Sequence, residues 1–351
     1  MKAKIFLVVL VSMLTSTFSA QTNLVAMNDS KASCTTHSNC SSTCQSNSEK
    51  AFTKVTFDNN GLVMAGNLFL PPNFDKNKKY ATIVCVHPGG GVKEQTAGLY
   101  AQKMAELGYV ALAFDASYQG ESGGEPRFLD NPMNRVGDIY SAVDYLVTLP
   151  YVDADRIGAI GICAGSGATV KASMTERRIK ALATVSAVDV GAAGRRGWDG
   201  KGSYDQIPML EEVAKQRTAE ANGAPLKYVN YVPQVGDKSA PRDLQEAADY
   251  YLTPRGQKPT APNKLLFRGQ SAAILFDGFG QADKLLTQPL LLIAGSEAGS
   301  LWHSQELNQK AASKDKELFI VKGATHMDLY DIPKYVDQAV GKMRAFFEKN
   351  L

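Results

Sequence analysis

The sequence predicts an α/β fold in which a mostly parallel central sheet is flanked by helices and carries an inserted helical lid. Two observations support this class: short, near-continuous apolar runs recur along the chain, and longer amphipathic stretches separate them. Such runs are typical of strands covered on both faces, and their alternation with helices implies parallel strands joined by right-handed crossovers. The predicted strands are residues 80–86, 110–114, 157–162, 181–188, 290–294 and 318–321.

The surrounding elements follow from similar patterns. Residues 55–57 and 62–70 predict an opening hairpin whose turn is Asn59-Asn60-Gly61, because Asn and Gly accept the positive φ of tight hairpin turns. Apolar residues at helical spacing predict the helices. These helices are residues 100–107, 136–149, 167–175, 304–312 and 332–347.

One long stretch interrupts the alternation. Residues 190–286 contain no comparable strand and show helical patterns around residues 209–219 and 243–251. This stretch is far longer than the usual connection of about 4–6 residues. A separate domain is the alternative, but the alternation of strand and helix resumes at Leu290, which favours a lid inserted into one domain over residues 51–351.

The first twenty residues differ from the rest of the chain. Lys2 and Lys4, a short apolar run and a small-residue end at Ser19-Ala20 predict a signal peptide over residues 1–20. A membrane anchor is the alternative, but hydroxyl residues interrupt the run, so a span of about 20 apolar residues is absent. We therefore expect export, to the periplasm or outside the cell, with no stable membrane insertion after cleavage.

Residues 21–50 predict a flexible leader, because they are rich in Ser, Thr and Asn and poor in large apolar side chains. The leader holds Cys34, Cys40 and Cys44 beside His37. These groups could bind zinc, but their spacing lacks the paired Cys-x2-Cys of a zinc knuckle. A local disulfide is favoured in an oxidising compartment, and it leaves one of the three thiols over.

The composition excludes several classes of protein. The 351 residues are 44% hydrophobic and 21% charged, with enough apolar mass for a sizeable core. The formal net charge of +3 is too small and too balanced for a nucleic-acid partner. No residue spacing in the chain indicates a metal or an organic cofactor, and we expect neither.

A candidate nucleophile follows the strand predicted at residues 157–162. The pentapeptide 161–165, Gly-Ile-Cys-Ala-Gly, has the spacing of a nucleophile elbow, with Cys163 where Ser usually stands. Small neighbours are needed because backbone crowds this sharp strand-to-helix turn. The N-terminal amides of the following helix should lower the pKa of the thiol and favour the thiolate.

Two other interpretations of this segment stay open. A looser serine pattern is centred on Ser166, but it lies three residues past the strand end, so its hydroxyl would be misplaced. Cys163 could also be a buried small apolar residue, as free cysteines often are and as we expect for Cys85. The glycines on both sides favour the elbow.

The partners of the thiol are predicted from chain order. His326 lies in the loop after the last strand, where the order nucleophile, acid, histidine places the general base. Glu297, just past the strand at 290–294, is the predicted acid that holds the imidazole and stabilises the imidazolium. Asp328 and Asp277 are alternatives for this acid.

A glycine run supplies the predicted oxyanion hole. His87-Pro88-Gly89-Gly90-Gly91 follows the strand at 80–86. The backbone amide of Gly89 or Gly90, together with that of Ala164, is placed to meet negative charge developing on a carbonyl oxygen. Tyr118 and Trp302 are the aromatic residues predicted to line the substrate pocket under the lid, and His303, next to Trp302, is expected to pack there.

These segments carry a family resemblance. With the elbow and the His326 loop, residues 114–124 and 249–256 make the chain from 52 to 350 resemble the α/β-hydrolase superfamily. More narrowly, it is similar to the dienelactone-hydrolase-like branch with a Cys-His-acid triad, in a group of largely uncharacterised bacterial members that includes relatives of fungal polyketide transferases. The resemblance implies Cys163 as nucleophile, His326 as base and Glu297 as acid. Many relatives have Asp in the acid loop.

Together these features predict a hydrolase acting on a small-molecule carboxylic ester, lactone or thioester. Cys163 would attack the carbonyl, backbone amides would stabilise the oxyanion, and His326 would move the proton. The thioester intermediate is also open to amines and alcohols, so an acyltransferase is the alternative. A second alternative is a catalytically idle binding or redox protein in which the leader cysteines matter.

Overall fold

An eight-stranded sheet forms the centre of the protein. The structure is a computed structural model and describes residues 52–351. The strands of the sheet are β1 (Thr53–Asn59), β2 (Leu62–Phe69), β3 (Tyr80–Val86), β4 (Val110–Phe114), β5 (Val152–Ile162), β6 (Ile179–Val185), β9 (Leu290–Gly295) and β10 (Lys316–Val321). The order across the sheet is β1-β2-β4-β3-β5-β6-β9-β10. Pairing is antiparallel from β1 to β4 and parallel from β4 to β10, so the predicted α/β class is confirmed.

Apolar sequence explains the inner strands and turn chemistry explains the edge. Every residue of β4 and β9 is buried, as expected for strands covered on both faces. Edge strand β1 is mostly exposed. The β1–β2 turn has Asn60 at φ 52° and Gly61 at φ 88°, the positive dihedrals of a tight hairpin, which confirms the predicted opening hairpin.

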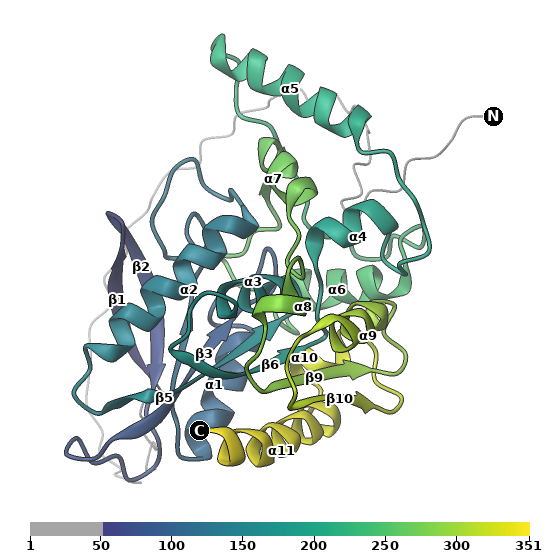
Figure 1. Cartoon of the computed structure of the whole chain (residues 1–351). Helices are drawn as coiled ribbons and strands as arrows, with labels where there is room; N and C mark the ends of the chain where they lie inside the picture. The colour runs from purple at the N-terminus through teal and green to yellow at the C-terminus, as the bar shows by residue number, and fades with distance from the viewer. Residues whose placement is uncertain (1–51) are drawn as a thin grey trace, which may run out of the picture. The chain divides into compact units, whose positions relative to one another are not determined.

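Helices cover both faces of this sheet (Figure 1). Four of the five begin a few residues before the predicted stretch, because the first helical turn needs no apolar residue. In one of them Pro132 follows the cap Asn131, whose side chain accepts the Met133 N–H. One face carries α1 (Thr96–Glu106) and α11 (Pro333–Asn350), and the other carries α2 (Pro132–Val147), α3 (Ala164–Ser173) and α9 (Leu301–Lys310).

The chain between β6 and β9 contains most of the other elements. It forms α4 (Val190–Arg196), α5 (Ile207–Ala221), β7 (Tyr228–Val229), α6 (Arg242–Leu252), β8 (Leu265–Leu266), η1 (Phe267–Gly269), α7 (Gln270–Leu275) and α8 (Ala282–Leu285). Helix α5 lies farthest from the sheet in Figure 1 and buries only Val213. Helix α6 buries five residues, including Asp243 and Tyr251. We call this segment, residues 190–286, the insertion.

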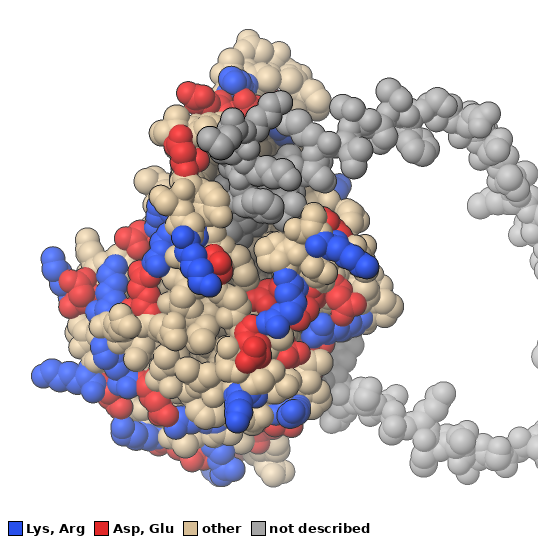
Figure 2. All heavy atoms as spheres, turned by 90° about the vertical axis from the view of Figure 1, so that its right-hand side faces the viewer, with Lys and Arg blue, Asp and Glu red and all other residues tan. Residues whose placement is uncertain are grey.

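The predicted signal peptide at 1–20 and the leader at 21–50, with Cys34, Cys40 and Cys44, lie outside the described residues. Within residues 52–351, no helix is both long enough and apolar enough to span a bilayer. Acidic and basic side chains intermingle over the face drawn in Figure 2. This mixture agrees with the nearly balanced charge of the sequence.

Candidate active site

The turn from β5 into α3 holds Cys163 in a strained conformation. Cys163 precedes the first residue of α3 with φ 53° and ψ −122°, a backbone region that L-residues seldom adopt and that clusters at functional sites. Close packing explains the flanking glycines. A Cβ on Gly161 would lie 2.6 Å from Ser166 Cα, and one on Gly165 would lie 2.5 Å from the Val86 carbonyl oxygen.

The alternative serine occupies a different environment. The Ser166 side chain is fully buried, and its hydroxyl donates to the Gly161 carbonyl at 2.8 Å. Cys163 lines a cavity of about 120 Å³, whereas Ser166 does not. The hydroxyl of Ser166 therefore ties the elbow together, and Cys163 is the group presented to the cavity.

Both the sheet and the insertion supply walls to this cavity. The loops and helices that follow the strands of the sheet contribute residues that include Gly89, Arg135, Cys163, Ala164, His326 and Tyr330. The insertion contributes residues that include Trp198, Tyr231, Asp243, Tyr251 and Gln270. The cavity is thus closed partly by aromatic side chains from a segment far away in the sequence.

His326 and the thiol are linked through a phenol. Tyr330 lies in α10 (Asp328–Asp331), and its hydroxyl is 3.3 Å from His326 Nε2. The same hydroxyl acts on the Cys163 thiol and lowers its pKa, and both groups line the cavity. On its other side, His326 Nδ1 lies 2.6 Å from Ser300 Oγ. The structure therefore brings Cys163 and His326 together, with Tyr330 between them.

Burial makes both members of this pair neutral. Desolvation raises the pKa of the Cys163 thiol, although the Tyr330 hydroxyl and the Ala164 amide act in the opposite direction. Desolvation also lowers the pKa of His326 to about 4, while the charge of Asp243 raises it. The Ala164 amide at the start of α3 acts in the predicted direction, but the loss of solvent outweighs it, so the pKa is raised and the neutral thiol, not the thiolate, is favoured.

The predicted acid does not reach the histidine. The side chain of Glu297 is exposed and accepts a hydrogen bond from Ser296 Oγ at 3.0 Å. Arg242 of the insertion donates to the Glu297 carbonyl oxygen. The chain turns after β9 so that Ser300, three residues further on, faces His326 Nδ1 instead.

The alternative acids are engaged elsewhere. Asp328 Oδ2 accepts the Thr325 N–H at 2.9 Å and thus holds its own loop. Asp277 lies beside the buried carboxylate of Asp189, which caps α4. Neither carboxylate is a hydrogen-bond partner of His326 in the described part of the chain.

The glycine loop is held in place by an ion pair that the sequence did not reveal. The Gly90 N–H donates to Asp130 Oδ2 at 3.3 Å, and Asp130 Oδ1 pairs with Arg135 Nε at 2.7 Å. The buried Arg135 also donates to the His87 carbonyl at 2.9 Å. The Gly90 amide is therefore directed away from a substrate oxygen, while Gly89 lines the cavity.

Neither aromatic residue predicted for the pocket lines the cavity. Tyr118 has φ 67° and packs against Gly124 in the loop after β4. Trp302 stacks on His303 and donates through Nε1 to the Trp198 carbonyl at 2.9 Å. Because Trp302 supports Trp198 from behind, its contact with the cavity is indirect.

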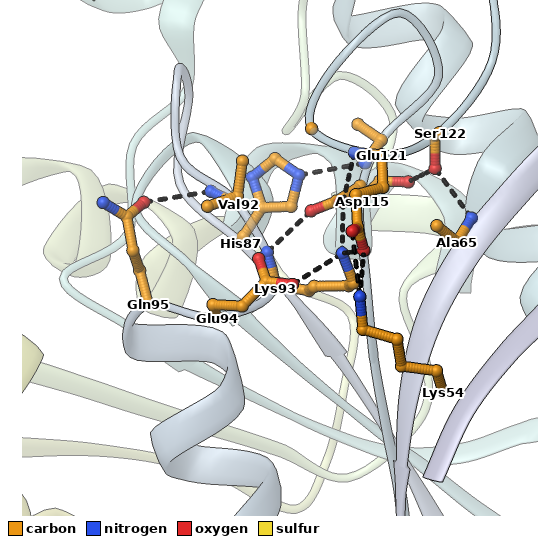
Figure 3. A network of polar contacts seen from close by, with 12 residues as sticks. Lys54, Ala65, His87, Val92, Lys93, Glu94, Gln95, Asp115, Glu121 and Ser122 are labelled. Carbon is orange, nitrogen blue, oxygen red and sulfur yellow. Dashed lines mark hydrogen bonds and ion pairs between the residues drawn. The ribbon is translucent and has the colours of Figure 1, made fainter. Parts of the chain in front are cut away.

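A second polar cluster lies beside the glycine loop (Figure 3). Glu94, Asp115 and Glu121 place carboxylate oxygens within 4.8 Å of one another, a set that could hold a cation. The ammonium of Lys93 lies 2.6 Å from Glu94, 2.7 Å from Asp115 and 2.7 Å from Glu121. A side chain of the protein therefore already occupies the position that a metal would take.

His87 also serves the framework. Its Nδ1 is 2.6 Å from the Pro88 carbonyl, and its Nε2 accepts the Ala116 N–H at 3.0 Å (Figure 3). Burial lowers the pKa of His87 well below the usual value. The imidazole of His87 thus joins the glycine loop to the loop after β4 and remains neutral.

Comparison with known proteins identifies the family of the chain. The profile of the dienelactone hydrolase family matches residues 64–187. An uncharacterised Escherichia coli protein, YcjY, is 47% identical over 302 residues, which are 85% of this chain and 99% of YcjY. The crystal structure of the hypothetical protein PA2218 from Pseudomonas aeruginosa has a TM-score of 0.79 at 35% identity, covering 86% of this chain and 94% of that one.

A fungal structure has a similar fold. The α/β hydrolase GrgF from a Penicillium species superimposes with a TM-score of 0.70 at 21% identity, covering 85% of this chain and 98% of GrgF. In sequence, GrgF is described as a polyketide transferase and is 25% identical over 233 residues, 65% of this chain and 74% of its own. This similarity establishes the α/β-hydrolase fold of the chain.

Proposed function

Since the chain belongs to the dienelactone hydrolase family of α/β-hydrolase enzymes, we propose that Cys163 attacks the carbonyl carbon of an ester, lactone or thioester. The observation that carries the proposal is the strained Cys163 at the end of β5, facing a cavity that also contains His326. A nucleophile with a general base in reach is the arrangement required for covalent acyl transfer.

The proton on sulfur leaves as the new bond forms. His326 is neutral because burial lowers its pKa to about 4, so it can take a proton from the neutral thiol. The Tyr330 hydroxyl lies between them and can pass its own proton to Nε2 while it accepts the one from Cys163. The Sγ–C bond forms and the carbonyl becomes an oxyanion, and collapse then expels the leaving group with the proton from His326.

Two backbone amides are proposed to meet the oxyanion. The Ala164 N–H is the first amide of α3 and already acts on the Cys163 sulfur. Gly89 lines the cavity beside it, whereas the Gly90 amide is directed at Asp130. We therefore assign the second donor to Gly89, because the donors of an oxyanion hole must point to where charge develops.

Water then cleaves the thioester in a hydrolase, whereas an amine or alcohol does so in an acyltransferase. One observation favours the second candidate. The Tyr231 ring of the insertion packs directly on the glycine loop, so a Cβ on Gly89 would meet its hydroxyl at 1.8 Å. Such an aromatic seal restricts water at the thioester. The description of GrgF as a polyketide transferase is consistent with this alternative.

Replacing Cys163 by Ala tests the nucleophile. We expect turnover of small aryl esters and thioesters to fall by at least about a thousandfold, as when a covalent nucleophile is removed from other hydrolases. Peptide mass spectrometry of wild-type protein quenched during turnover should find the acyl group on Cys163. Cys85→Ala is the matched control, since Cys85 is fully buried in β3. Unchanged turnover in Cys163→Ala would contradict the proposal.

A partition experiment separates the two enzyme classes. Wild-type protein is given one aryl thioester with increasing concentrations of a small amine, and acid and amide products are both quantified. A hydrolase releases mostly acid at every amine concentration. An acyltransferase gives amide as the main product and little acid in water alone.

A further inference from the structure

A buried carboxylate from the insertion stands behind the catalytic histidine. Asp243 lies in the first turn of α6, is 3% exposed and lines the cavity. Its Oδ1 lies 3.7 Å from Nε of Arg242, which is itself largely exposed. Burying a carboxylate costs free energy unless donors or charges compensate, so the neighbours of Asp243 show what it serves.

Two hydrogen bonds direct Asp243 toward His326. Its Oδ2 accepts the Gly299 N–H at 2.7 Å and the Trp198 Nε1–H at 2.8 Å. Gly299 immediately precedes Ser300, whose hydroxyl is 2.6 Å from His326 Nδ1. The ring of Trp198 meets the imidazole edge-on, with centroids 5.0 Å apart. The Asp243 carboxylate thus fixes Trp198 and the backbone beside Ser300, and both Trp198 and Ser300 contact the His326 imidazole.

Among residues 52–351, Asp243 is the one charged group that acts on the His326 imidazole. The other titratable groups facing His326 are Cys163, Tyr330 and His303, and burial shifts the pKa of each toward its neutral form. Near Asp243 itself, the charged neighbours are Arg242 and Glu246, both on α6. Glu297, the acid expected from chain order, is exposed and bonded to Ser296.

We propose that Asp243 is the positioning acid of this site, acting on His326 through Ser300 and Trp198 and through its own charge. The inference rests on the proposed function, since it assigns the group that stabilises the imidazolium formed when Cys163 attacks. It also gives the insertion a chemical role. The acid and Trp198 both belong to residues 190–286, so the site is complete only when this segment is docked on the sheet.

The test compares Asp243→Asn with Asp249→Asn, a neighbour on α6 whose carboxylate is largely exposed. We expect kcat for an aryl thioester to fall at least about tenfold in Asp243→Asn, from loss of a charge-assisted interaction, with KM within a factor of about three. Asp249→Asn should retain the wild-type kcat. Asp243→Glu, which keeps the charge, should recover part of the loss.

A pH profile distinguishes positioning from a structural defect. Wild-type protein should have about half of its neutral activity at pH 4, where His326 becomes protonated. Without the Asp243 charge the pKa of His326 falls further, so Asp243→Asn should keep a larger fraction of its own lower rate at pH 4 than wild type does. A variant that was merely damaged would lose activity faster in acid.

Several outcomes would overturn the inference. An unchanged kcat in Asp243→Asn while Cys163→Ala is inactive refutes Asp243 and leaves the proposed function standing. If Glu297→Gln lowers kcat tenfold and moves the pH profile toward acid, while Asp243→Asn does neither, the positioning acid is Glu297. If circular dichroism shows that Asp243→Asn is unfolded, Ser300→Ala breaks the same link from the other end, and an unchanged kcat there counts against the inference.

Discussion

The cluster around Lys93 and the cavity around Cys163 both adjoin the glycine loop, but they use buried polar groups in different ways. In the Lys93 cluster every group is paired with opposite charge or a backbone amide (Figure 3). In the cavity, thiol, imidazole and phenol meet as neutral groups. The chain thus uses buried charge to fix geometry, in the Lys93 cluster and at Asp243 in the cavity wall, and neutral groups where the proposed mechanism moves a proton.

The Lys93 cluster holds the glycine loop, which carries the proposed oxyanion donor Gly89. The Lys93 N–H donates to Asp115 Oδ1 at 2.8 Å, and its ammonium lies 2.7 Å from Asp115 Oδ2. Asp115 Oδ2 also accepts the Glu121 N–H at 2.8 Å. Since Asp115 follows β4 and Lys93 follows the glycine loop, these bonds connect two strand ends.

The cavity has polar groups whose hydrogen-bonding capacity is not used within the protein. The Tyr251 hydroxyl and the Gln270 amide nitrogen are buried without a hydrogen-bond partner among the described residues, and both residues line the cavity. Unsatisfied polar groups of this kind cost stability and persist where a ligand uses them. The cavity therefore offers a substrate polar contacts that the folded chain does not use.

Breaking the fixed cluster should have the largest effect on folding. Lys93→Met removes an ammonium that is 1% exposed and leaves Asp115, which is fully buried, without its counter-charge. Loss of one partner from a buried ion pair costs about 3–5 kcal/mol. Urea denaturation followed by circular dichroism should show this loss in the free energy of unfolding.

An exposed lysine of the same cluster provides the control. Lys54 pairs with Glu121 at 2.9 Å, but its side chain is 62% exposed. Exposed pairs contribute about 0–1 kcal/mol, so Lys54→Met should change the free energy of unfolding by less than about 1 kcal/mol. Equal losses in the two variants would mean that burial is not what makes the cluster important.

The sheet could be predicted from the sequence because local pattern determines it. Apolar runs marked the strands, and the glycines around Cys163 marked a turn so crowded that a Cβ on Gly161 or Gly165 would lie only 2.6 Å or 2.5 Å from neighbouring backbone. The loop with His326 followed from chain order alone. These features depend on residues close together in the sequence.

The supporting groups could not be predicted because they depend on how the insertion docks. Tyr330 lies just before the helix predicted at residues 332–347 and carried no signal of its own, and Asp243 lies 83 positions before His326 on a helix that the pattern could not orient. Chain order placed Glu297 in the correct loop, but not the direction of its side chain. Trp198 carried no signal beyond being aromatic, and Tyr251 belonged to the segment 249–256 that carries the family resemblance but had no predicted role.

Tyr330→Phe tests whether the Tyr330 hydroxyl takes part in the proposed proton transfer from Cys163 to His326. The change removes only the hydroxyl between His326 and Cys163. A hydrogen bond to a group that becomes charged contributes about 1.5–3 kcal/mol, so kcat should fall by about 10- to 150-fold. Stopped-flow measurement of acylation with an aryl thioester isolates this step from later hydrolysis.

Tyr250→Phe is the matched control for the phenol. Tyr250 packs edge-on against Tyr330, with ring centroids 5.3 Å apart, and is 3% exposed, but it does not line the cavity. We expect its acylation rate to stay within about twofold of wild type. If Tyr330→Phe behaves like Tyr250→Phe, the proton passes from sulfur to His326 without the phenol.

The smallest expected effect is that of lowering the pH from 7 to 5, which should leave kcat/KM almost unchanged. In the proposed mechanism His326 acts as a base in its neutral form, and burial lowers its pKa to about 4, so we expect about 90% of the activity to remain at pH 5. An exposed histidine with a pKa of about 6.5 would leave only about 3% active at that pH. Measuring kcat/KM between pH 4 and 8, with circular dichroism at each point, separates these cases. A midpoint near 6.5 would mean that His326 is solvated in the working enzyme, and that the buried imidazole described here is not the state that reacts.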